Sequence, residues 1–154
     1  MRRTDKEIND SQIIENILAE SQVCRLGLVD DGEAYIVPVN YVFMDGCIYI
    51  HSAAEGRKIE ILKRNPKVTF EIEYSSQVIK SEIACRWGMK YRSIMGKGTI
   101  EIYYDIESKK KGFDILMKKY GAEFLAVYDE AALDKSILLK LKVESITGKQ
   151  SGIW

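Results

Sequence analysis

Two Asp-Gly dipeptides constrain the fold of this chain more than any other local feature. Asp31-Gly32 and Asp45-Gly46 each separate two of three apolar runs, Val23–Val29, Ala34–Phe43 and Cys47–His51. Aspartate and glycine both tolerate positive φ, so a tight Asp-Gly turn matches the twist of antiparallel strands. We therefore predict that the chain begins its fold as a meander of three antiparallel strands.

Alternation of apolar and polar side chains predicts further strands. Val68–Tyr74 alternates strictly, Tyr91–Tyr104 forms a longer strand, and Leu139–Glu144 forms the last one. Gly96 and Gly98 interrupt the long strand. Glycine inside a strand favours a sharp bend or a close backbone approach, and such bends let a sheet close into a barrel.

Three segments have the pattern of amphipathic helices. Asp10 can cap the first, and Pro66 ends the second, which spans Arg57–Arg64. Asp105 caps the third helix, whose apolar face is expected to be core packing. That face consists of Phe113, Leu116, Met117 and Tyr120. The run Lys109–Lys111 on the same helix is predicted to be a solvated face.

The chain has 154 residues, 46% of them hydrophobic, which suits one soluble domain with a substantial core. Ser75–Met89 is the least regular segment and suggests a strand broken by polar residues. The fold class is predicted to be mainly β with peripheral α, a split antiparallel β-barrel of six to seven strands with two to three outer helices. A single domain covers residues 1–154, with residues 1–9 as an N-terminal arm.

Charge and hydropathy exclude some classes of partner. Lysine plus arginine equals aspartate plus glutamate, at 23 each, so no global field attracts nucleic acid. A barrel that binds single-stranded nucleic acid through Tyr91, Tyr103 and Tyr104 is therefore disfavoured. The N-terminus lacks the apolar stretch of a signal peptide, and no apolar run approaches membrane-spanning length. We expect no nucleic acid and no membrane as partners.

The cysteine pattern favours a reducing compartment. Cys24, Cys47 and Cys85 are widely spaced, without a Cys-x-x-Cys pair, as expected for free thiols in the cytoplasm. Cys24 and Cys47 lie in apolar strands, where burial makes a thiol inert, and Cys85 beside Arg86 is only a weak candidate nucleophile. The chain has one histidine and no cluster with ligand spacing, so no metal site is predicted.

The helix Arg57–Arg64 begins with charges of the unexpected sign. Arg57 and Lys58 face the partial positive charge of a helix N-terminus, which costs roughly 0.3–1 kcal/mol for each exposed cation and is only partly offset by Glu55. A bound phosphate would remove this cost, because the free N–H groups, the dipole and both cations would point at it. The other interpretation is that both are solvated surface charges.

Pro38 interrupts the second strand of the meander. Proline cannot donate a hydrogen bond to a neighbouring strand, so this strand is an edge, is bulged, or faces a ligand at that point.

Four motifs in this order resemble the pyridoxamine 5′-phosphate oxidase-like FMN-binding split-barrel superfamily, nearest to the nitroimidazole-resistance (Nim) type flavoproteins. The motifs are Tyr35-Ile-Val-Pro-Val-Asn-Tyr41, Tyr49-Ile-His-Ser-Ala53, Gly56-Arg-Lys58, and Tyr91-Arg-Ser93 followed by Gly96-Lys-Gly98. The resemblance covers nearly the whole chain.

The resemblance implies a homodimer with two FMN sites at its interface. The cofactor-binding residues that it implies are Val37, Pro38, Val39, Asn40 and Tyr41 along the isoalloxazine edge, His51 and Ser52 beside the ring and ribityl chain, and Arg57, Lys58, Arg92 and Ser93 at the phosphate. It also gives Pro38 a reason, since its strand would face the flavin.

His51 is the candidate catalytic residue, because an unperturbed histidine exchanges protons near neutral pH. The alternative is a satisfied histidine that only shapes the pocket. We expect an FMN-dependent oxidoreductase acting on a small acceptor, such as a nitroimidazole, another nitroaromatic or a quinone-like compound. The alternative is a non-redox flavin- or haem-binding module on the same barrel, and a deazaflavin in place of FMN stays open.

Two departures narrow that expectation. No Gly-x-Gly-x-x-Gly element follows a strand, so a nicotinamide donor would have no domain of its own. Pyridoxamine phosphate oxidases carry a longer arginine-rich C-terminal segment that this sequence lacks, which disfavours oxidation of vitamin B6.

Overall fold

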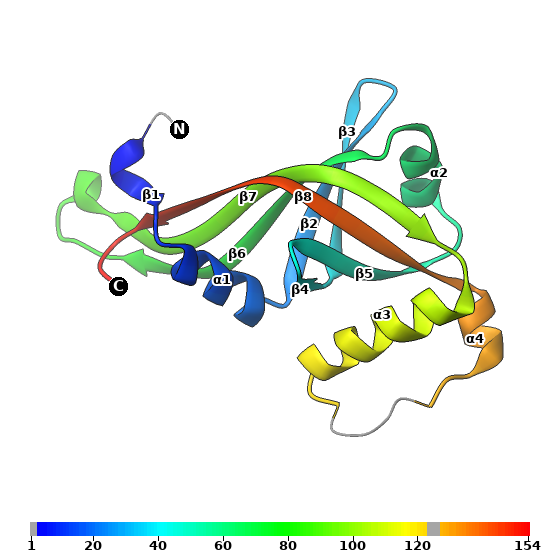
Figure 1. Ribbon diagram of the computed structural model, residues 1–154. Coiled ribbons are helices and arrows are strands. Elements are labelled where there is room, and N and C mark those ends of the chain that lie inside the picture. Colours follow the sequence, from blue (N-terminus) through cyan, green and yellow to red (C-terminus); the bar gives the residue numbers. More distant parts are fainter. Residues whose placement is uncertain (1–2, 123–126) are drawn as a thin grey trace.

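The computed structural model describes residues 3–122 and 127–154, and over this part eight strands form one antiparallel sheet (Figure 1). The strands are β1 (Glu7–Ile8), β2 (Val23–Asp30), β3 (Glu33–Asn40), β4 (Val42–Met44), β5 (Cys47–Ala53), β6 (Lys67–Ile79), β7 (Gly88–Tyr103) and β8 (Ser136–Ser151). The helices are α1 (Ser11–Glu20), α2 (Arg57–Arg64), α3 (Ile106–Lys119) and α4 (Glu130–Asp134), with 3-10 turns η1 (Thr4–Lys6) and η2 (Ala84–Arg86). The protein is mainly β, as predicted, and the short elements β1 and α4 are additions to the prediction.

The sheet closes on itself. Neighbouring strands follow the order β3-β2-β6-β7-β8-β5-β4, and β1 pairs with the far end of β8. β3 and β4 end this path on opposite sides, yet only Tyr41 separates them in the chain. The sheet therefore curls until its two edges approach, which is the predicted split barrel. Both Asp-Gly turns form as expected, with positive φ at Asp31 and Asp45.

Two glycines let β7 bend. A side chain at Gly96 would collide with the ring of Phe70, and one at Gly98 would collide with the carbonyl oxygen of Lys142. The pairing of β7 with β8 shifts register between Lys97 and Gly98. The predicted close backbone approach is confirmed, and a register shift of this kind increases the local twist of the sheet.

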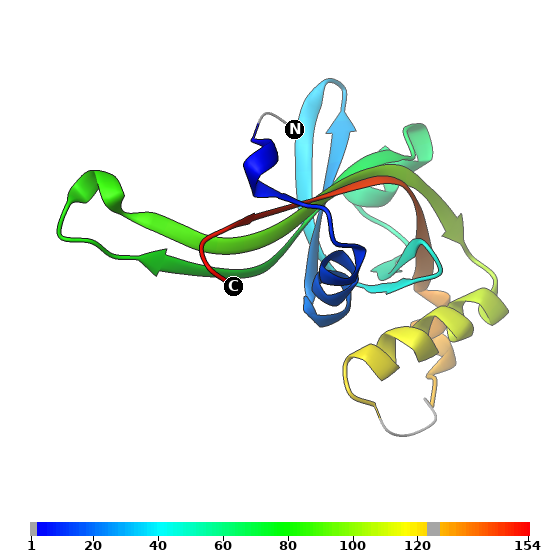
Figure 2. The same cartoon turned by 60° about the vertical axis from the view of Figure 1, so that its left-hand side comes forward.

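β6 and β7 continue beyond the barrel as a two-stranded ribbon that ends at η2 (Figure 2). The irregular segment Ser75–Met89 is therefore the end of β6, the turn at its tip and the start of β7. The ribbon carries a row of exposed apolar side chains, Val78, Ile79, Ile83, Trp87 and Met89. Such a row on a projecting element is typical of a surface that binds a partner.

The predicted helix caps are confirmed. The Asp10 carboxylate accepts a hydrogen bond from the Gln12 N–H at 2.9 Å, and the Asp105 carboxylate accepts one from the Ser108 N–H at 2.8 Å. α2 ends at Arg64, just before Pro66, as predicted.

α3 lies across the outer face of the sheet, near β5 and β8 (Figure 1). Phe113 and Leu116 are buried against that face, whereas Met117 and Tyr120 are 42% and 36% exposed. The prediction of a four-residue core face is therefore wrong at Met117 and Tyr120, because the sheet covers only one side of this helix.

Lys109 corrects the prediction of a solvated lysine run. Its side chain is 4% exposed, and its ammonium group donates to the carbonyl oxygens of Leu133 at 2.6 Å and Ser136 at 3.3 Å. The buried cation thus joins α3 to the segment around α4, since backbone carbonyls replace the water that it loses.

None of the described helices is long and apolar enough to cross a bilayer. The described residues contain no group of three or more side chains placed to hold a metal ion. Cys24, Cys47 and Cys85 are free thiols. Burial raises the pKa of Cys24 to about 12, which agrees with the prediction that it is inert.

Candidate functional site

The first turn of α2 is an uncapped helix start. Gly56 precedes it with φ of 113°, a conformation that favours glycine, and provides no side chain to accept a hydrogen bond. The N–H groups of Ile59 and Glu60 both donate to the Gly56 carbonyl oxygen. Those of Arg57 and Lys58 precede the first possible helical acceptor, so they stay available to a bound anion.

Arg57 is held by an acid from another part of the chain. Its guanidinium donates to the Asp30 carboxylate at 2.9 Å and lies 4.8 Å from the centroid of the Tyr35 ring. Arg64, one helix length further on, pairs with the same carboxylate. The unfavourable charge of Arg57 at the helix N-terminus is therefore offset within the protein. Arg57 is neither a fully solvated charge nor one that needs a ligand for balance.

Lys58 is the more available cation of the two. Its side chain is half-buried, and burial lowers the pKa of its ammonium group. Over residues 3–122 and 127–154, no carboxylate forms an ion pair with it. A half-buried ammonium without an acidic partner favours an anion beside it, because a charge-assisted bond would restore the solvation that it has lost.

His51 lies next to Lys58, at the end of β5. Burial lowers the pKa of its imidazole, and the Lys58 charge lowers it further. The ring packs edge-on against Phe113, with 4.6 Å between ring centroids and 72° between planes. Burial and the Lys58 charge both favour the neutral imidazole, in which one nitrogen can donate and the other can accept a hydrogen bond.

A cavity of about 230 Å³ opens beside His51, between β5, α3 and α4. Its lining residues are His51, Phe113, Val127, Tyr128, Asp129, Ala132, Leu133 and Ser136. Most of this lining is apolar, so His51 is one of few polar groups that could orient a small planar molecule there.

The neighbouring Ser52 faces the other side of the sheet. It is 5% exposed, and its hydroxyl donates to the Ala53 carbonyl oxygen at 3.0 Å. Successive strand residues point to opposite faces, so the side chains of His51 and Ser52 do not meet. Ser52 can reach a ligand at α2 only through the lone pairs of its hydroxyl or through its backbone.

β3 is an edge strand, so the first of the three interpretations of Pro38, a proline on an edge strand, is confirmed. Pro38 pairs with Arg25 of β2, and β2 is the only strand that pairs with β3 in the described sheet. Pro38 and Asn40 are exposed, whereas Val37 is half-buried and Val39 is 9% exposed. The outward side of β3 is thus open to a planar ligand or to a second chain.

The side chain of Tyr41 is part of the core. Its ring is fully buried, and its hydroxyl donates to the Leu18 carbonyl oxygen at 2.8 Å. Its backbone N–H donates to the Tyr120 hydroxyl at 3.0 Å, and its carbonyl oxygen accepts from the same hydroxyl at 3.1 Å. The joint between β3 and β4 is thus packed against α1 and α3, and a cofactor contact at Tyr41 stays a prediction.

Arg92 and Ser93 lie on β7 near the base of the ribbon, where β7 still pairs with both β6 and β8. Arg92 pairs with Gln150 of β8, and Ser52 pairs with Ile137 of the same strand. Measured along β8, Gln150 and Ile137 are about 40 Å apart at roughly 3.3 Å per residue. One chain therefore does not bring the two halves of the expected phosphate site together.

The Arg92 side chain is held by two residues near the end of the chain, Gln150 and Trp154. Its Nε donates to the Gln150 side chain at 3.1 Å, and its guanidinium lies 4.3 Å from the centroid of the Trp154 ring. Lys90 packs on the same ring at 4.4 Å. The C-terminal tryptophan thus holds two cations of the ribbon in place.

Sequence reasoning missed Asp30 and Tyr35 as partners of Arg57, and Phe113 as the neighbour of His51. Each contact joins residues far apart in the chain, so no local sequence pattern predicts it. An acid directly before an Asp-Gly turn was the only available signal for Asp30.

Solved structures with this fold include flavin proteins. The crystal structure of a candidate 5-nitroimidazole antibiotic resistance protein from Bacteroides thetaiotaomicron is 32% identical, with a TM-score of 0.82, and the match covers 93% of this chain and 85% of that one. The flavocytochrome Anf3 from Azotobacter vinelandii has a TM-score of 0.86 at 16% identity, covering 99% of this chain and 72% of that one. The FAD and heme binding protein from Mycobacterium smegmatis has a TM-score of 0.85 at 19% identity, covering 97% and 75%. At such identities the last two establish the fold alone.

One curated relative matches a shorter stretch. The uncharacterized protein RA0666 of Rhizobium meliloti is 33% identical over 63 residues, which are 40% of this chain and 41% of that protein. The match thus spans about two fifths of the relative's length.

The sequence family described as pyridoxamine 5′-phosphate oxidase matches residues 10–150. This range runs from the cap of α1 to the last residue but one of β8 and includes all the other strands except β1. The protein belongs to the pyridoxamine 5′-phosphate oxidase family.

Proposed function

We propose that this protein is a homodimeric flavoprotein that binds FMN and passes electrons from it to a small planar acceptor. The observation that carries the proposal is the first turn of α2, where an uncapped helix start, the Lys58 ammonium and His51 lie together. An anionic, aromatic cofactor suits this combination, since the phosphate meets the helix start and the ring meets the histidine.

The residues present fit a phosphate. The N–H groups of Arg57 and Lys58 are available, and a side chain added at Gly56 would meet only open space. Free N–H groups at a helix N-terminus are typical of a phosphate-binding site. The Arg57 side chain is engaged by Asp30 through its Nε, so Lys58 is the cation assigned to the phosphate.

The chain's own contribution to the chemistry is binding, orientation and proton control. Bound flavin supplies the electron transfer. Lys58 supplies positive charge near the cofactor, and His51 offers a neutral imidazole that can accept a proton from solvent and then, as the imidazolium, pass it to an acceptor. Phe113 and Leu133 form an apolar wall beside the imidazole, which itself stays exposed.

A second copy of the chain would complete the site. The projecting ribbon has exposed apolar side chains, and Arg92 is held near its base by Trp154, several residues along β7 from the part of that strand that bonds to the chain just after α2. In a two-fold dimer, the ribbon of one chain can reach the α2 region of the other. Arg92 and Ser93 would then join Lys58 from across the interface.

The acceptor is proposed from the cavity and one relative. The space beside His51 is small and mostly apolar, which fits a single-ring acceptor such as a nitroaromatic or quinone-like compound. The Bacteroides thetaiotaomicron protein carries a 5-nitroimidazole resistance description at 32% identity. Both support a nitro compound as the first acceptor to test.

The test uses the full chain loaded with FMN under anaerobic conditions. Stopped-flow absorbance should show reduction of the flavin by NADH or NADPH, and then reoxidation on mixing with a 5-nitroimidazole or with benzoquinone. Flavin that binds but is neither reduced nor reoxidised in these experiments would reject the oxidoreductase and leave a non-redox flavin-binding module.

The haem alternative has its own signature. His51 is the only histidine of the chain and is the residue that would hold the iron of such a group. Haem bound in place of flavin would give an intense Soret band that disappears in His51→Ala, whereas bound FMN would survive that substitution.

A further inference from the structure

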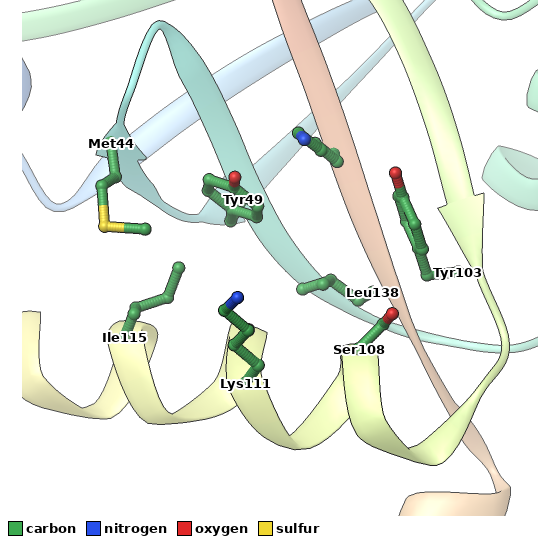
Figure 3. A pocket seen from close by; sticks show the side chains of 9 residues that line it. Met44, Tyr49, Tyr103, Ser108, Lys111, Ile115 and Leu138 are labelled. Carbon is green, nitrogen blue, oxygen red and sulfur yellow. The ribbon is translucent and has the colours of Figure 1, made fainter.

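The structure has a second cavity besides the one at His51, and it lies away from the start of α2. A cavity of about 150 Å³ lies between α3 and the outer face of the sheet (Figure 3). Its lining residues are Met44, Tyr49, Tyr103, Ser108, Lys111, Gly112, Ile115, Leu138 and Lys140. None of the residues discussed for flavin binding is among them.

Gly112 and Leu138 explain why the hollow exists. A side chain at Gly112 would collide with Leu138, so α3 sits directly on β8 at this point. The helix packs closest to the sheet at the glycine and leaves room toward Met44 and Ile115, whose side chains Figure 3 shows at the other end of the hollow. The cavity is therefore built into the way that α3 packs.

The walls suit one aromatic ring. Tyr49 from β5 and Tyr103 from β7 project into the space, with Met44 and Leu138 completing the apolar part (Figure 3). Phenol rings favour offset or edge-on contact with another ring, and a thioether packs well at a ring edge. An apolar cavity of about 150 Å³ has room for a benzene-sized molecule.

The polar groups suit an anion. Lys111 and Lys140 both line the cavity, and neither forms an ion pair with any carboxylate of the described residues. Glu101, whose charge acts on Lys140, pairs with Lys142 at 2.6 Å and accepts from the Tyr103 hydroxyl at 2.8 Å. Lys111 and Lys140 thus remain without an ion-pair partner among the described residues, at the mouth of an aromatic pocket.

Lys111 points into this space instead of away from it. Figure 3 shows its amine rising from α3 toward the sheet, between Ile115 and Ser108. The Lys140 ammonium lies 5.8 Å from the centroid of the Tyr49 ring, within reach of a weak cation–π contact. Both ammonium groups can therefore approach a carboxylate whose ring lies against Tyr49.

We infer that this cavity is a binding site for a single-ring aromatic carboxylate, distinct from the flavin site. The ring would occupy the space between Tyr49, Tyr103 and Leu138, and the carboxylate would meet Lys111 and Lys140 at the opening. The inference is independent of flavin binding, since it depends only on the contacts of α3 with the outer face of the sheet.

The probe is 4-fluorobenzoate, followed by fluorine NMR with the full chain. We expect saturable binding, at least tenfold weaker binding of 4-fluorobenzyl alcohol, and at least tenfold weaker binding of the acid to Lys111→Met and Lys140→Met. Ile115→Phe should abolish binding by filling the cavity. Lys118→Met, an exposed lysine in the last turn of the same helix, should bind like wild type.

Three results would overturn the assignment. The first is no saturable binding to the wild-type chain. The second is binding that Lys111→Met, Lys140→Met and Ile115→Phe all leave unchanged. The third is displacement of the probe by FMN in direct competition, because that result would make the hollow part of the flavin site. Lys111 is exposed, so its substitution leaves the fold intact.

Discussion

The Arg57 guanidinium donates to the Asp30 carboxylate, with 2.9 Å between Nε and Oδ2, and so joins the start of α2 to the end of β2. Arg64 pairs with the same carboxylate. Two arginines thus share one acid, whose side chain is only 15% exposed. The arrangement fixes the orientation of α2 on the barrel and leaves Lys58 without an ion-pair partner among the described residues.

Asp30→Asn should lower the free energy of unfolding by about 1–2 kcal/mol, since it weakens two charge-assisted contacts at a mostly buried carboxylate. FMN affinity should stay the same or rise, because the change removes a negative charge from the phosphate's surroundings. Urea denaturation and fluorescence titration with FMN measure the two effects.

Asp31→Asn is the matched control for Asp30→Asn. Asp31 is the next residue, forms no ion pair with any described residue, and has a positive φ that asparagine tolerates. Its stability and FMN affinity should stay near wild type. Loss of FMN binding in Asp30→Asn alone would show that Asp30 positions Arg57 for the phosphate, contrary to the role given to Lys58.

His51 should have a pKa below its ordinary value of 6.5, because burial and the Lys58 charge both disfavour the imidazolium. Lys58→Met should raise this pKa by removing the charge, and FMN should raise it in the wild-type chain by adding a negative phosphate. The chain has one histidine, so an NMR titration reports it without assignment.

The same shift predicts a pH dependence of stability. The folded chain binds the His51 proton less readily than the unfolded chain, so stability from this group is lost as pH falls below about 6.5. His51→Gln should flatten that part of the profile. A pKa of His51 that responds to neither Lys58→Met nor FMN would separate His51 from the proposed site.

Local signals predicted the barrel, because most of its determinants are local. Both Asp-Gly turns and the alternation of Val68–Tyr74 depend on near neighbours in sequence, and the bend at Gly96 and Gly98 depends on the absence of a side chain. The caps Asp10 and Asp105 act within three residues.

The site was harder to predict, because its contacts join distant segments. The partners Asp30 and Arg57 are 27 residues apart, and only the folded barrel brings them together. Lys109 belongs to a lysine run that looks solvated, yet it finds two carbonyl acceptors near α4. Arg92 was expected beside Lys58, and only a second chain can place it there.

Lys119 predicts a second pH effect at the joint of α1 and α3. Its ammonium donates to the carbonyl oxygens of Ser21 at 2.7 Å and Leu18 at 3.2 Å, and burial lowers its pKa to about 8. The unfolded chain holds this proton up to about 10.5, so between pH 8 and 10.5 this group adds stability as pH rises.

Lys119→Met tests that sign. The variant should be less stable at pH 7, because two carbonyl oxygens lose a donor, and the difference in slope between wild type and variant should appear from pH 8 upward. Measurements are best kept below pH 9, because near pH 9 the Cys24 thiol loses its proton in the unfolded chain and adds a second pH effect. Parallel stability curves for the two proteins over this range would remove Lys119 as the cause.

A site shared between two chains predicts complementation. Lys58→Met and Arg92→Ala should each weaken FMN binding, by roughly 10- to 100-fold if each removes one charge-assisted contact. Co-refolding the two variants should create heterodimers with one intact site each, and tight FMN binding should reappear in part of the mixture. Sedimentation of each variant alone provides the control for dimer formation.

Complementation separates a shared site from two unrelated roles. Variants that dimerise but never regain tight binding on mixing would place Arg92 outside the FMN site, whatever the oligomeric state. A monomeric wild-type chain that binds FMN tightly would reject the two-chain site altogether.

The central claim is that the start of α2 and Lys58 bind the phosphate of FMN, and the most direct measurement compares FMN with riboflavin, which lacks that phosphate. The account predicts that the wild-type chain binds FMN roughly 100-fold or more tightly than riboflavin, that Lys58→Met loses most of this difference, and that Lys63→Met in the last turn of α2 keeps it. Equal affinity of the wild-type chain for FMN and riboflavin would contradict the claim.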